Sequence, residues 1–192
     1  GINLNLPAGS FVSLVGESGC GKSTIAGILA AKNRGYNGEI TIGGVPLNEV
    51  NETNLMQRVV LVRHNSYLFK GTVEENLKMA KPDATKEEME AVLQTQDGLQ
   101  TQLLEKASNL SGGQCQRLVI ARALLRTDSA VYIFDEAASN IDVEREELIM
   151  NVIHELAKTK TVLLISHRLA NVVKSDKIYF LKDGEIKESG KH

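Results

Sequence analysis

The sequence predicts an α/β protein with a mainly parallel sheet flanked by helices. Short β-branched runs recur along the chain and alternate with helical patterns, which is typical of strand–helix–strand units. A polar, helical stretch interrupts this alternation in the middle of the chain. We therefore expect one α/β core with an antiparallel β portion near the N-terminus and an inserted helical subdomain.

The predicted strands are short apolar runs bounded by polar residues. The first, Phe11 to Val15, is followed by a helix rich in Ala, Ile and Leu from Lys22 to Ala31. From Glu144 to Ala157 the apolar residues recur at helical spacing, which predicts a helix with one face on the core. Gly1 to Leu6 also alternates like a strand. Further strands are predicted at Glu39 to Ile42, Val59 to Val62, Val131 to Phe134, Thr161 to Ile165 and Lys177 to Leu181.

The middle of the chain, from Thr72 to about Gln96, is polar and helical. Thr72 with Glu75, and Thr85 with Glu88, have the T-x-x-E spacing of capping boxes, in which the two side chains close a helix start. We therefore place an inserted helical subdomain at about residues 71–126.

Composition limits the classes of partner. The chain has 192 residues, a size typical of one domain, and a net charge of -2 with both signs interspersed. It lacks the basic block that a nucleic-acid surface needs, so no nucleic acid is expected as a partner. Two cysteines without paired spacing favour a reducing setting, and no apolar run approaches the roughly 20 residues of a membrane helix.

A glycine-rich loop follows the first predicted strand. Residues Gly16 to Ser23 match G-x-x-x-x-G-K-S between a strand and a helix, the context in which this pattern binds phosphate. Its glycines let backbone N–H groups converge on phosphate oxygens at a helix start. Lys22 is expected to hold the β- and γ-phosphates, and Ser23 to be a ligand of Mg²⁺. The nucleotide-binding residues predicted here are Gly16, Glu17, Ser18, Gly19, Cys20, Gly21, Lys22, Ser23 and Thr24.

Two acidic residues end the strand predicted at Val131 to Phe134. Ligands bind at the carboxyl ends of strands in open α/β sheets, so Asp135 is expected to reach Mg²⁺ through water. Glu136 is placed to orient or deprotonate an attacking water. Two acids after a strand are also typical of an ordinary surface turn. The phosphate-binding loop in the same chain favours the catalytic interpretation.

A pair of glycines lies in Leu110 to Gln114, before a predicted helix from Arg117 to Arg126. Ser111 and Gln114 have capping-box spacing, which explains a helix start but not the two glycines between them. Glycines there leave the helix N-terminus and its N–H groups open to an anion. The segment suits a second contact with phosphate.

Five elements in this order resemble the nucleotide-binding domain of ABC transporters. The five-residue signature Leu110 to Gln114 separates that family from other phosphate-loop ATPases. The resemblance covers nearly the whole chain and implies a P-loop NTPase fold, with residues 1–70 and 127–192 as a RecA-like core and the subdomain carrying the signature. The elements are Gly16 to Ser23, Leu110 to Gln114, Val131 to Glu136, Ser139-Asn140-Ile141-Asp142 and Ser166-His167-Arg168.

The resemblance implies an ATPase that uses ATP and Mg²⁺ and closes as a head-to-tail dimer. Ser111 and Gly113 of one copy would contact the γ-phosphate held by the glycine loop of the other. Glu136 matches the catalytic glutamate, and His167 matches the histidine that contacts the γ-phosphate and the attacking water. The other positions matched to nucleotide contacts are Gly112, Gln114 and, in the loop that crosses the dimer interface, Asp142.

Among ABC domains the chain is similar to exporters that carry permease and ATPase in one polypeptide, on the evidence of Tyr67 to Thr72 and Ser166 to Leu169. We therefore expect a piece of a longer transporter at the cytoplasmic face of the cell membrane. Its expected partners are a second ABC ATPase domain, identical or different, and a transmembrane permease domain. The alternatives are a soluble, ribosome-associated ABC ATPase and a regulatory module that does not hydrolyse; retention of Glu136 and His167 argues against the latter.

His64 departs from the family pattern. The resemblance aligns it with a glutamine whose oxygen meets Mg²⁺, and imidazole is a poorer partner for this hard ion. A water molecule in the coordination site is the alternative to a direct role for His64. We expect His64→Gln to keep or raise the ATPase rate of the full transporter, measured as phosphate release. A large loss of rate would show that His64 has a positive role of its own.

Overall fold

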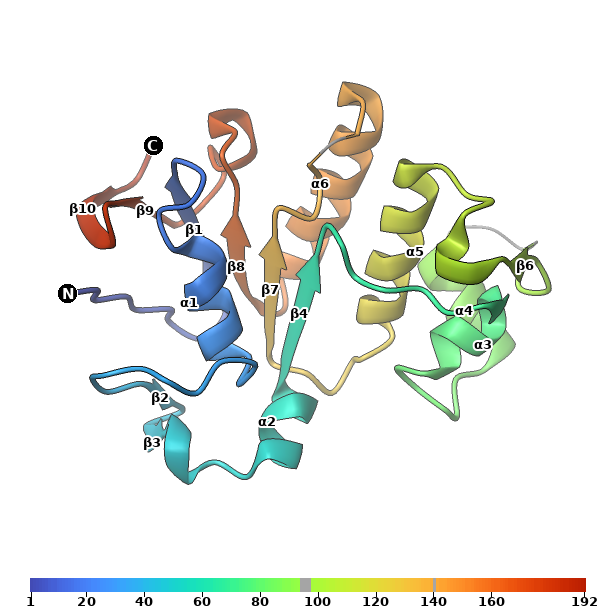
Figure 1. Cartoon of the computed structure of the whole chain (residues 1–192), viewed down its shortest axis with the longest axis horizontal. Helices are drawn as coiled ribbons and strands as arrows, with labels where there is room; N and C mark the ends of the chain where they lie inside the picture. Colours follow the sequence, from blue (N-terminus) through green and yellow to red (C-terminus); the bar gives the residue numbers. More distant parts are fainter. Residues whose placement is uncertain (94–97, 140) are drawn as a thin grey trace. The chain divides into compact units, whose positions relative to one another are not determined.

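The computed structural model describes residues 1–93, 98–139 and 141–192 (Figure 1). Six strands of this part of the chain form one sheet in the order β10-β9-β1-β8-β7-β4. β1 pairs in parallel with β8 and β9, and β8 with β7, whereas β10 is antiparallel to β9. The predicted α/β class with a mainly parallel sheet is confirmed. The strands are β1 (Phe11–Gly16), β4 (Val59–Arg63), β7 (Val131–Asp135), β8 (Thr161–Ile165), β9 (Lys177–Lys182) and β10 (Glu185–Gly190).

Two short antiparallel ribbons and the helices complete the described structure. One ribbon is β2 (Thr41–Ile42) with β3 (Val45–Pro46), near the N-terminus as predicted, and the other is β5 (Gly71–Thr72) with β6 (Gln102–Leu103). The helices are α1 (Lys22–Leu29), α2 (Glu52–Arg58), α3 (Val73–Lys78), α4 (Lys86–Leu93), α5 (Gly112–Leu124) and α6 (Val143–Ala157), with 3-10 turns at Leu47–Glu49, Glu105–Ala107 and Leu169–Asn171.

The chain divides into two compact units. The first comprises Gly1–Leu61, Asp128–Glu136 and His154–His192, and the second Val62–Thr127 and Ala137–Ile153. In the second unit α3 and α4 both pack against α5. The expected division into a core and a subdomain at about residues 71–126 stays a prediction, because compactness also groups residues 137–153 with these helices.

Alternation along the parallel strands builds the core of the first unit. Val12 and Leu14 of β1 are fully buried in one hydrophobic cluster with Ile25 and Ala26 of α1. Neighbouring strands contribute Ile133, Leu163, Ile165 and Leu181 to the same cluster. Burial of these residues fixes the pairing of β1, β8 and β7, and so places the loops that follow the three strands at one edge of the sheet.

Local signals for helix starts are confirmed where the structure describes them. Thr72 Oγ1 accepts a hydrogen bond from the Glu75 N–H at 3.0 Å, at the start of α3. Before α4, Thr85 and Glu88 form both bonds of a capping box, at 3.2 and 2.9 Å. The end of the predicted polar helical stretch, residues 94–97, lies outside the described residues.

Two predicted strands differ from the structure. No strand forms over residues 1–6. Leu4 and Leu6 pack against the hydrophobic core instead, and the Asn5 N–H between them donates a hydrogen bond to Tyr179 Oη at 3.2 Å. The alternation there reflects packing rather than sheet pairing. The strand predicted from Glu39 begins only at Thr41, because its partner β3 ends at Pro46, opposite Thr41, where a 3-10 turn begins at Leu47. Within the described ranges, no helix has the length and apolar character to cross a membrane.

His154, in α6, packs in an apolar setting of the first unit. Its ring meets Phe11 edge-on with 5.6 Å between centroids, and both ring nitrogens are buried without a hydrogen-bond partner among the described residues. Burial lowers the pKa of His154 below its ordinary value, and the positive charge of Lys174 adds to this effect. Folding therefore favours the neutral ring.

Acid should destabilise the fold through His154. The stabilisation is fully present above the unfolded-state pKa of about 6.5 and is lost as the pH falls from there through the lower folded-state pKa. We expect His154→Phe to reduce the fall in unfolding free energy between about pH 7.5 and pH 5, measured by urea denaturation at each pH. His192→Phe, which changes an exposed terminal histidine, is the control. Identical pH dependence in both variants would contradict the role of His154.

Candidate functional site

The loop from Gly16 to Ser23 joins the carboxyl end of β1 to α1. Gly19 and Gly21 have φ of 80° and 107°, a region that favours glycine. Gly16 is required for another reason: a Cβ there would collide with the backbone oxygen of Leu181 and lie 2.8 Å from Cys20 Sγ. The loop thus runs against β9 and then turns sharply into the helix.

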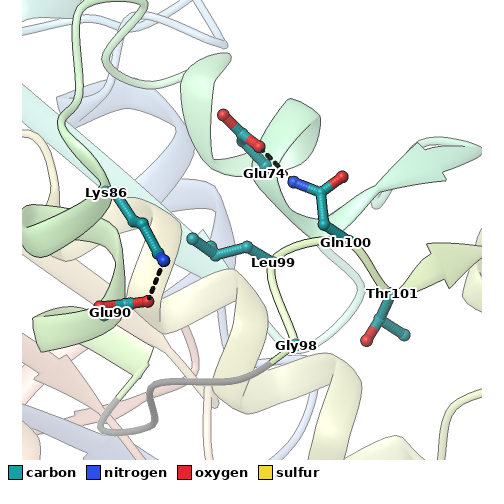
Figure 2. Close-up of a pocket in the computed structure, with 7 residues that line it drawn as sticks. All are labelled: Glu74, Lys86, Glu90, Gly98, Leu99, Gln100 and Thr101. Carbon is teal, nitrogen blue, oxygen red and sulfur yellow. Dashed lines mark hydrogen bonds and ion pairs between the residues drawn. The ribbon is translucent and has the colours of Figure 1, made fainter.

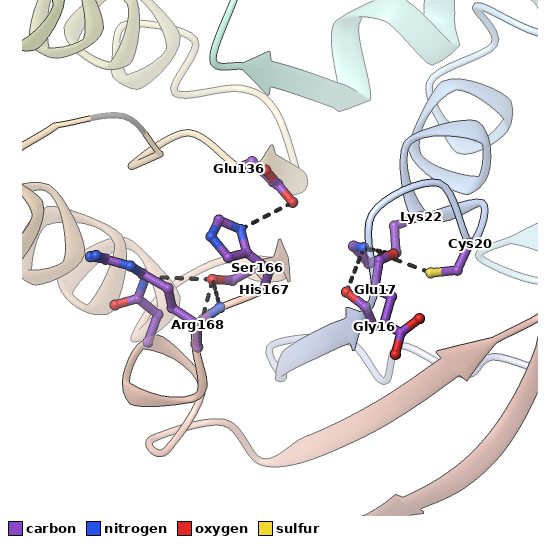
Figure 3. Close-up of polar contacts among 9 residues, drawn as sticks. Gly16, Glu17, Cys20, Lys22, Glu136, Ser166, His167 and Arg168 are labelled. Carbon is purple, nitrogen blue, oxygen red and sulfur yellow. Dashed lines mark hydrogen bonds and ion pairs between the residues drawn. The ribbon is translucent and has the colours of Figure 1, made fainter.

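Lys22 turns its side chain back into this loop (Figure 3). Nζ donates hydrogen bonds to the carbonyl oxygens of Gly16 and Glu17, both at 2.7 Å, and lies 3.7 Å from Cys20 Sγ. The residue is only 5% exposed. The two carbonyls are neutral, so they do not offset the charge of the ammonium, and a phosphate oxygen would be a stronger partner.

The first turn of α1 faces solvent. Ser23 and Thr24 are exposed there, and Gly21, the N-cap, has no side chain to cap the helix. The N–H groups and dipole at a helix start attract anions. The loop from Gly16 to Ser23, the Lys22 ammonium and the start of α1 therefore lie together within the first unit, where they could bind an anion.

Asp135, Glu136 and His167 follow the neighbouring strands β7 and β8. Asp135 is buried at the end of β7, opposite Ile165 of β8. Glu136 has φ of 51°, the left-handed region, while its N–H donates to the Ile165 oxygen at 3.0 Å. This turn brings Glu136 Oε1 to 3.4 Å from His167 Nδ1, and Figure 3 shows the two side chains pointing toward each other.

Ser166 shapes the loop that carries His167. Its Oγ accepts a hydrogen bond from the Arg168 N–H at 3.0 Å, and its own N–H donates to the Leu14 oxygen of β1 at 3.3 Å. The histidine is therefore anchored to the strand that leads into the glycine loop. The structure brings together, in one unit, the glycine loop, Asp135, Glu136 and His167.

The signature segment lies in the second unit, at the start of α5. Ser111 Oγ accepts from the Gln114 N–H at 3.2 Å, and Gln114 Oε1 accepts from the Ser111 N–H at 2.9 Å, which is the predicted capping box. Gly112 and Gly113 form the first turn between them. The helix start is thus capped by its own side chains.

Asp142, also in the second unit, begins α6. Its Oδ1 accepts a hydrogen bond from the Arg145 N–H at 3.0 Å, and its Oδ2 lies 3.3 Å from Arg145 Nε. Arg145 was not predicted; the only signal in the sequence is its spacing of three residues from an acid. Asn140, within the predicted loop Ser139 to Asp142, lies outside the described residues.

His64 is exposed in the turn after β4. It belongs to the second unit, whereas Ser23 and Asp135 belong to the first, so its predicted role toward Mg²⁺ stays a prediction. Over the described ranges, no three His, Cys, Asp or Glu side chains gather as a metal site. A bound Mg²⁺ would need hydroxyl, water or nucleotide oxygens as well as carboxylate.

A separate cavity of about 500 Å³ lies in the second unit (Figure 2). Its charged groups are paired: Lys86 Nζ lies 3.6 Å from Glu90 Oε1, and Gln100 Nε2 donates to Glu74 at 2.7 Å. None of the predicted site residues lines it.

Comparison with known proteins identifies the family. The model of the ABC transporter family matches residues 1–139. An uncharacterized ABC transporter ATP-binding protein of Haemophilus influenzae is 46% identical over 201 residues, which cover all of this chain and 36% of that protein. The ATP-dependent lipid A-core flippase of Escherichia coli (strain K12) is 42% identical over 202 residues, covering all of this chain and 34% of the flippase.

A solved structure agrees with these sequence matches. The structure of a bacterial Atm1-family ABC exporter with ATP bound matches with a TM-score of 0.92 and 33% identity, covering the whole chain and 35% of the exporter chain. The present chain thus spans about a third of the length of the relatives it matches. The family match over residues 1–139, together with the glycine loop and the acidic end of β7, shows that the chain is a nucleotide-binding ATPase domain of the ABC transporter family.

Proposed function

We propose that this chain binds ATP with Mg²⁺, hydrolyses it together with a second ABC domain, and thereby powers export through a permease domain of the same polypeptide. The observation that carries the proposal is the common edge of β1, β8 and β7. There the first unit places Lys22 in its glycine loop and a Glu136–His167 pair 3.4 Å apart. The exporter and flippase names of two relatives support the export role.

Nucleotide binding would begin with an exchange at Lys22. The ammonium leaves the carbonyl oxygens of Gly16 and Glu17 for the oxygens of the β- and γ-phosphates, which carry charge. Ser23 and Asp135 fit Mg²⁺, because both offer the oxygen ligands that this ion prefers. When bound, the ion supplies positive charge against the phosphate oxygens.

Hydrolysis would transfer the γ-phosphoryl group in line to water. The water oxygen forms a bond to the γ-phosphorus as the bond to the bridging oxygen of ADP breaks, and Glu136 takes the proton of the water. His167 holds the Glu136 carboxylate and reaches the γ-phosphate. The second copy would contribute its Ser111, Gly112, Gly113, Gln114 and Asp142 to the same site.

The second unit has a surface suited to the permease. Tyr67 and Phe69 are 46% and 44% exposed, and their rings contact edge-on at 4.7 Å between centroids. Gly71 pairs with Leu103 in the antiparallel β5–β6 ribbon, so the residues before Gly71 and those after Leu103 lie at the same end. This end therefore carries Phe69, the exposed Leu104 and the acidic Glu105. An apolar segment would fit this end. Such docking would hold the chain at the cytoplasmic face of a membrane.

Replacement of Glu136 tests the proposed chemistry. We expect Glu136→Gln to lower kcat by about 100-fold or more, because the amide cannot accept the proton of the water. Phosphate release gives the rate, and a binding titration should give an unchanged Kd for ATP. The control is Glu144→Gln, which changes a different acidic residue, located in the first turn of α6. Full turnover by Glu136→Gln would refute the assigned role.

Cys20 reports occupancy of the glycine loop. In a Cys115→Ala variant we expect ADP to slow maleimide labelling of Cys20, because the phosphates would cover a thiol that lies 3.7 Å from Lys22 Nζ. The converse variant, Cys20→Ala, retains Cys115, and burial raises the pKa of that thiol and slows its reaction. Labelling of Cys115 should not respond to ADP. Mass spectrometry over time measures both rates, and a Cys20 rate indifferent to ADP would place the nucleotide elsewhere.

A further inference from the structure

Arg145 joins the starts of two helices in the second unit. Its Nε lies 3.3 Å from Asp142 Oδ2, beside the N-cap of α6. The same side chain covers Gly113, the second residue of α5: a Cβ at Gly113 would lie 2.8 Å from Arg145 Cδ and 3.3 Å from Nη1. One arginine therefore contacts both Asp142 and the signature segment.

Fold stability does not account for this contact. The Arg145 and Asp142 side chains are 49% and 55% exposed, and exposed ion pairs contribute little to the free energy of unfolding. The contact instead affects the packing at the start of α5. The aliphatic stem of Arg145 lies on the bare face of Gly113, so a larger residue at 113 would displace the arginine from this contact.

We propose that Arg145 is a positioning residue for ATP hydrolysis. It holds the Gly113 backbone at a fixed place relative to Asp142, so that the two meet the nucleotide of the other copy together. The inference rests on the proposed function, in which these segments complete a second copy's site.

The test uses the full-length protein that carries this chain. We expect Arg145→Ala to lower kcat for ATP hydrolysis about three- to tenfold, the range for residues that act through a coupled neighbour. The Kd for ADP, which lacks the γ-phosphate, and the Tm should stay at wild-type values. Arg145→Lys should retain most of the activity, because its stem can lie on Gly113 and its ammonium can reach Asp142.

A matched control lies at the other end of α6. Lys158 forms an exposed i,i+3 ion pair with Glu155 at 2.8 Å and contacts no proposed site residue. Lys158→Ala should turn over like wild type. If Arg145→Ala also turns over like wild type, or if it loses ADP affinity or Tm along with kcat, the positioning role is overturned.

A double-mutant cycle tests whether Arg145 acts through Asp142. Asp142→Asn keeps an oxygen that can cap α6 but removes the charge facing Arg145. The double variant Arg145→Ala/Asp142→Asn should be no slower than the slower single variant, whereas multiplicative losses would overturn the coupling. Absence of hydrolysis in both wild type and Lys158→Ala would instead refute the proposed function itself, and the inference with it.

Discussion

The parallel pairing of β1, β8 and β7 is the constraint on which the site depends. Leu14 and Asp135 both lie opposite Ile165, on the two sides of β8, so β7 and β8 end at the same level and β1 runs two residues further. The glycine loop, the acidic pair and His167 are brought together by this alignment rather than by contacts of their own. The buried apolar residues that fix the pairing are thus as important for the chemistry as the polar residues that carry it.

The chain uses a glycine-rich helix start twice, in two different ways. At α1 the N-cap is Gly21, which leaves the end of the helix without a side-chain cap. At α5 the cap is complete, because Ser111 and Gln114 bond to each other's backbone. The first arrangement leaves N–H groups of the helix start open to an anion. The second suits a surface that must keep its shape before an anion arrives from elsewhere.

The sequence predicted those features that follow from local chemistry. Apolar runs located five of the six sheet strands within a residue or two, and capping pairs located helix starts, because both depend on neighbours along the chain. The edge strand β10 was missed, because it is mostly polar and exposed. The glycine pattern located the loop between β1 and α1. The strand predicted over residues 1–6 was wrong, because an alternating pattern does not say whether a pairing strand is available. Two contacts were not predicted: the Lys22 side chain turns back into its own loop, and the Arg145 side chain packs on Gly113. Both depend on residues that meet only after folding, so no sequence pattern predicts them.

The backbone of Glu136 has a consequence for how such a domain changes over time. A non-glycine residue with φ of 51° sits in a region that glycine or asparagine occupies with less strain. At this position, then, a change to glycine or asparagine relieves the backbone and removes the carboxylate, whereas a change to aspartate relieves it and keeps a shorter one. If Glu136 has the role proposed above, selection for turnover works against this conformational preference. A copy released from that selection would be expected to lose this acid early, while the fold and the phosphate-binding loop persist.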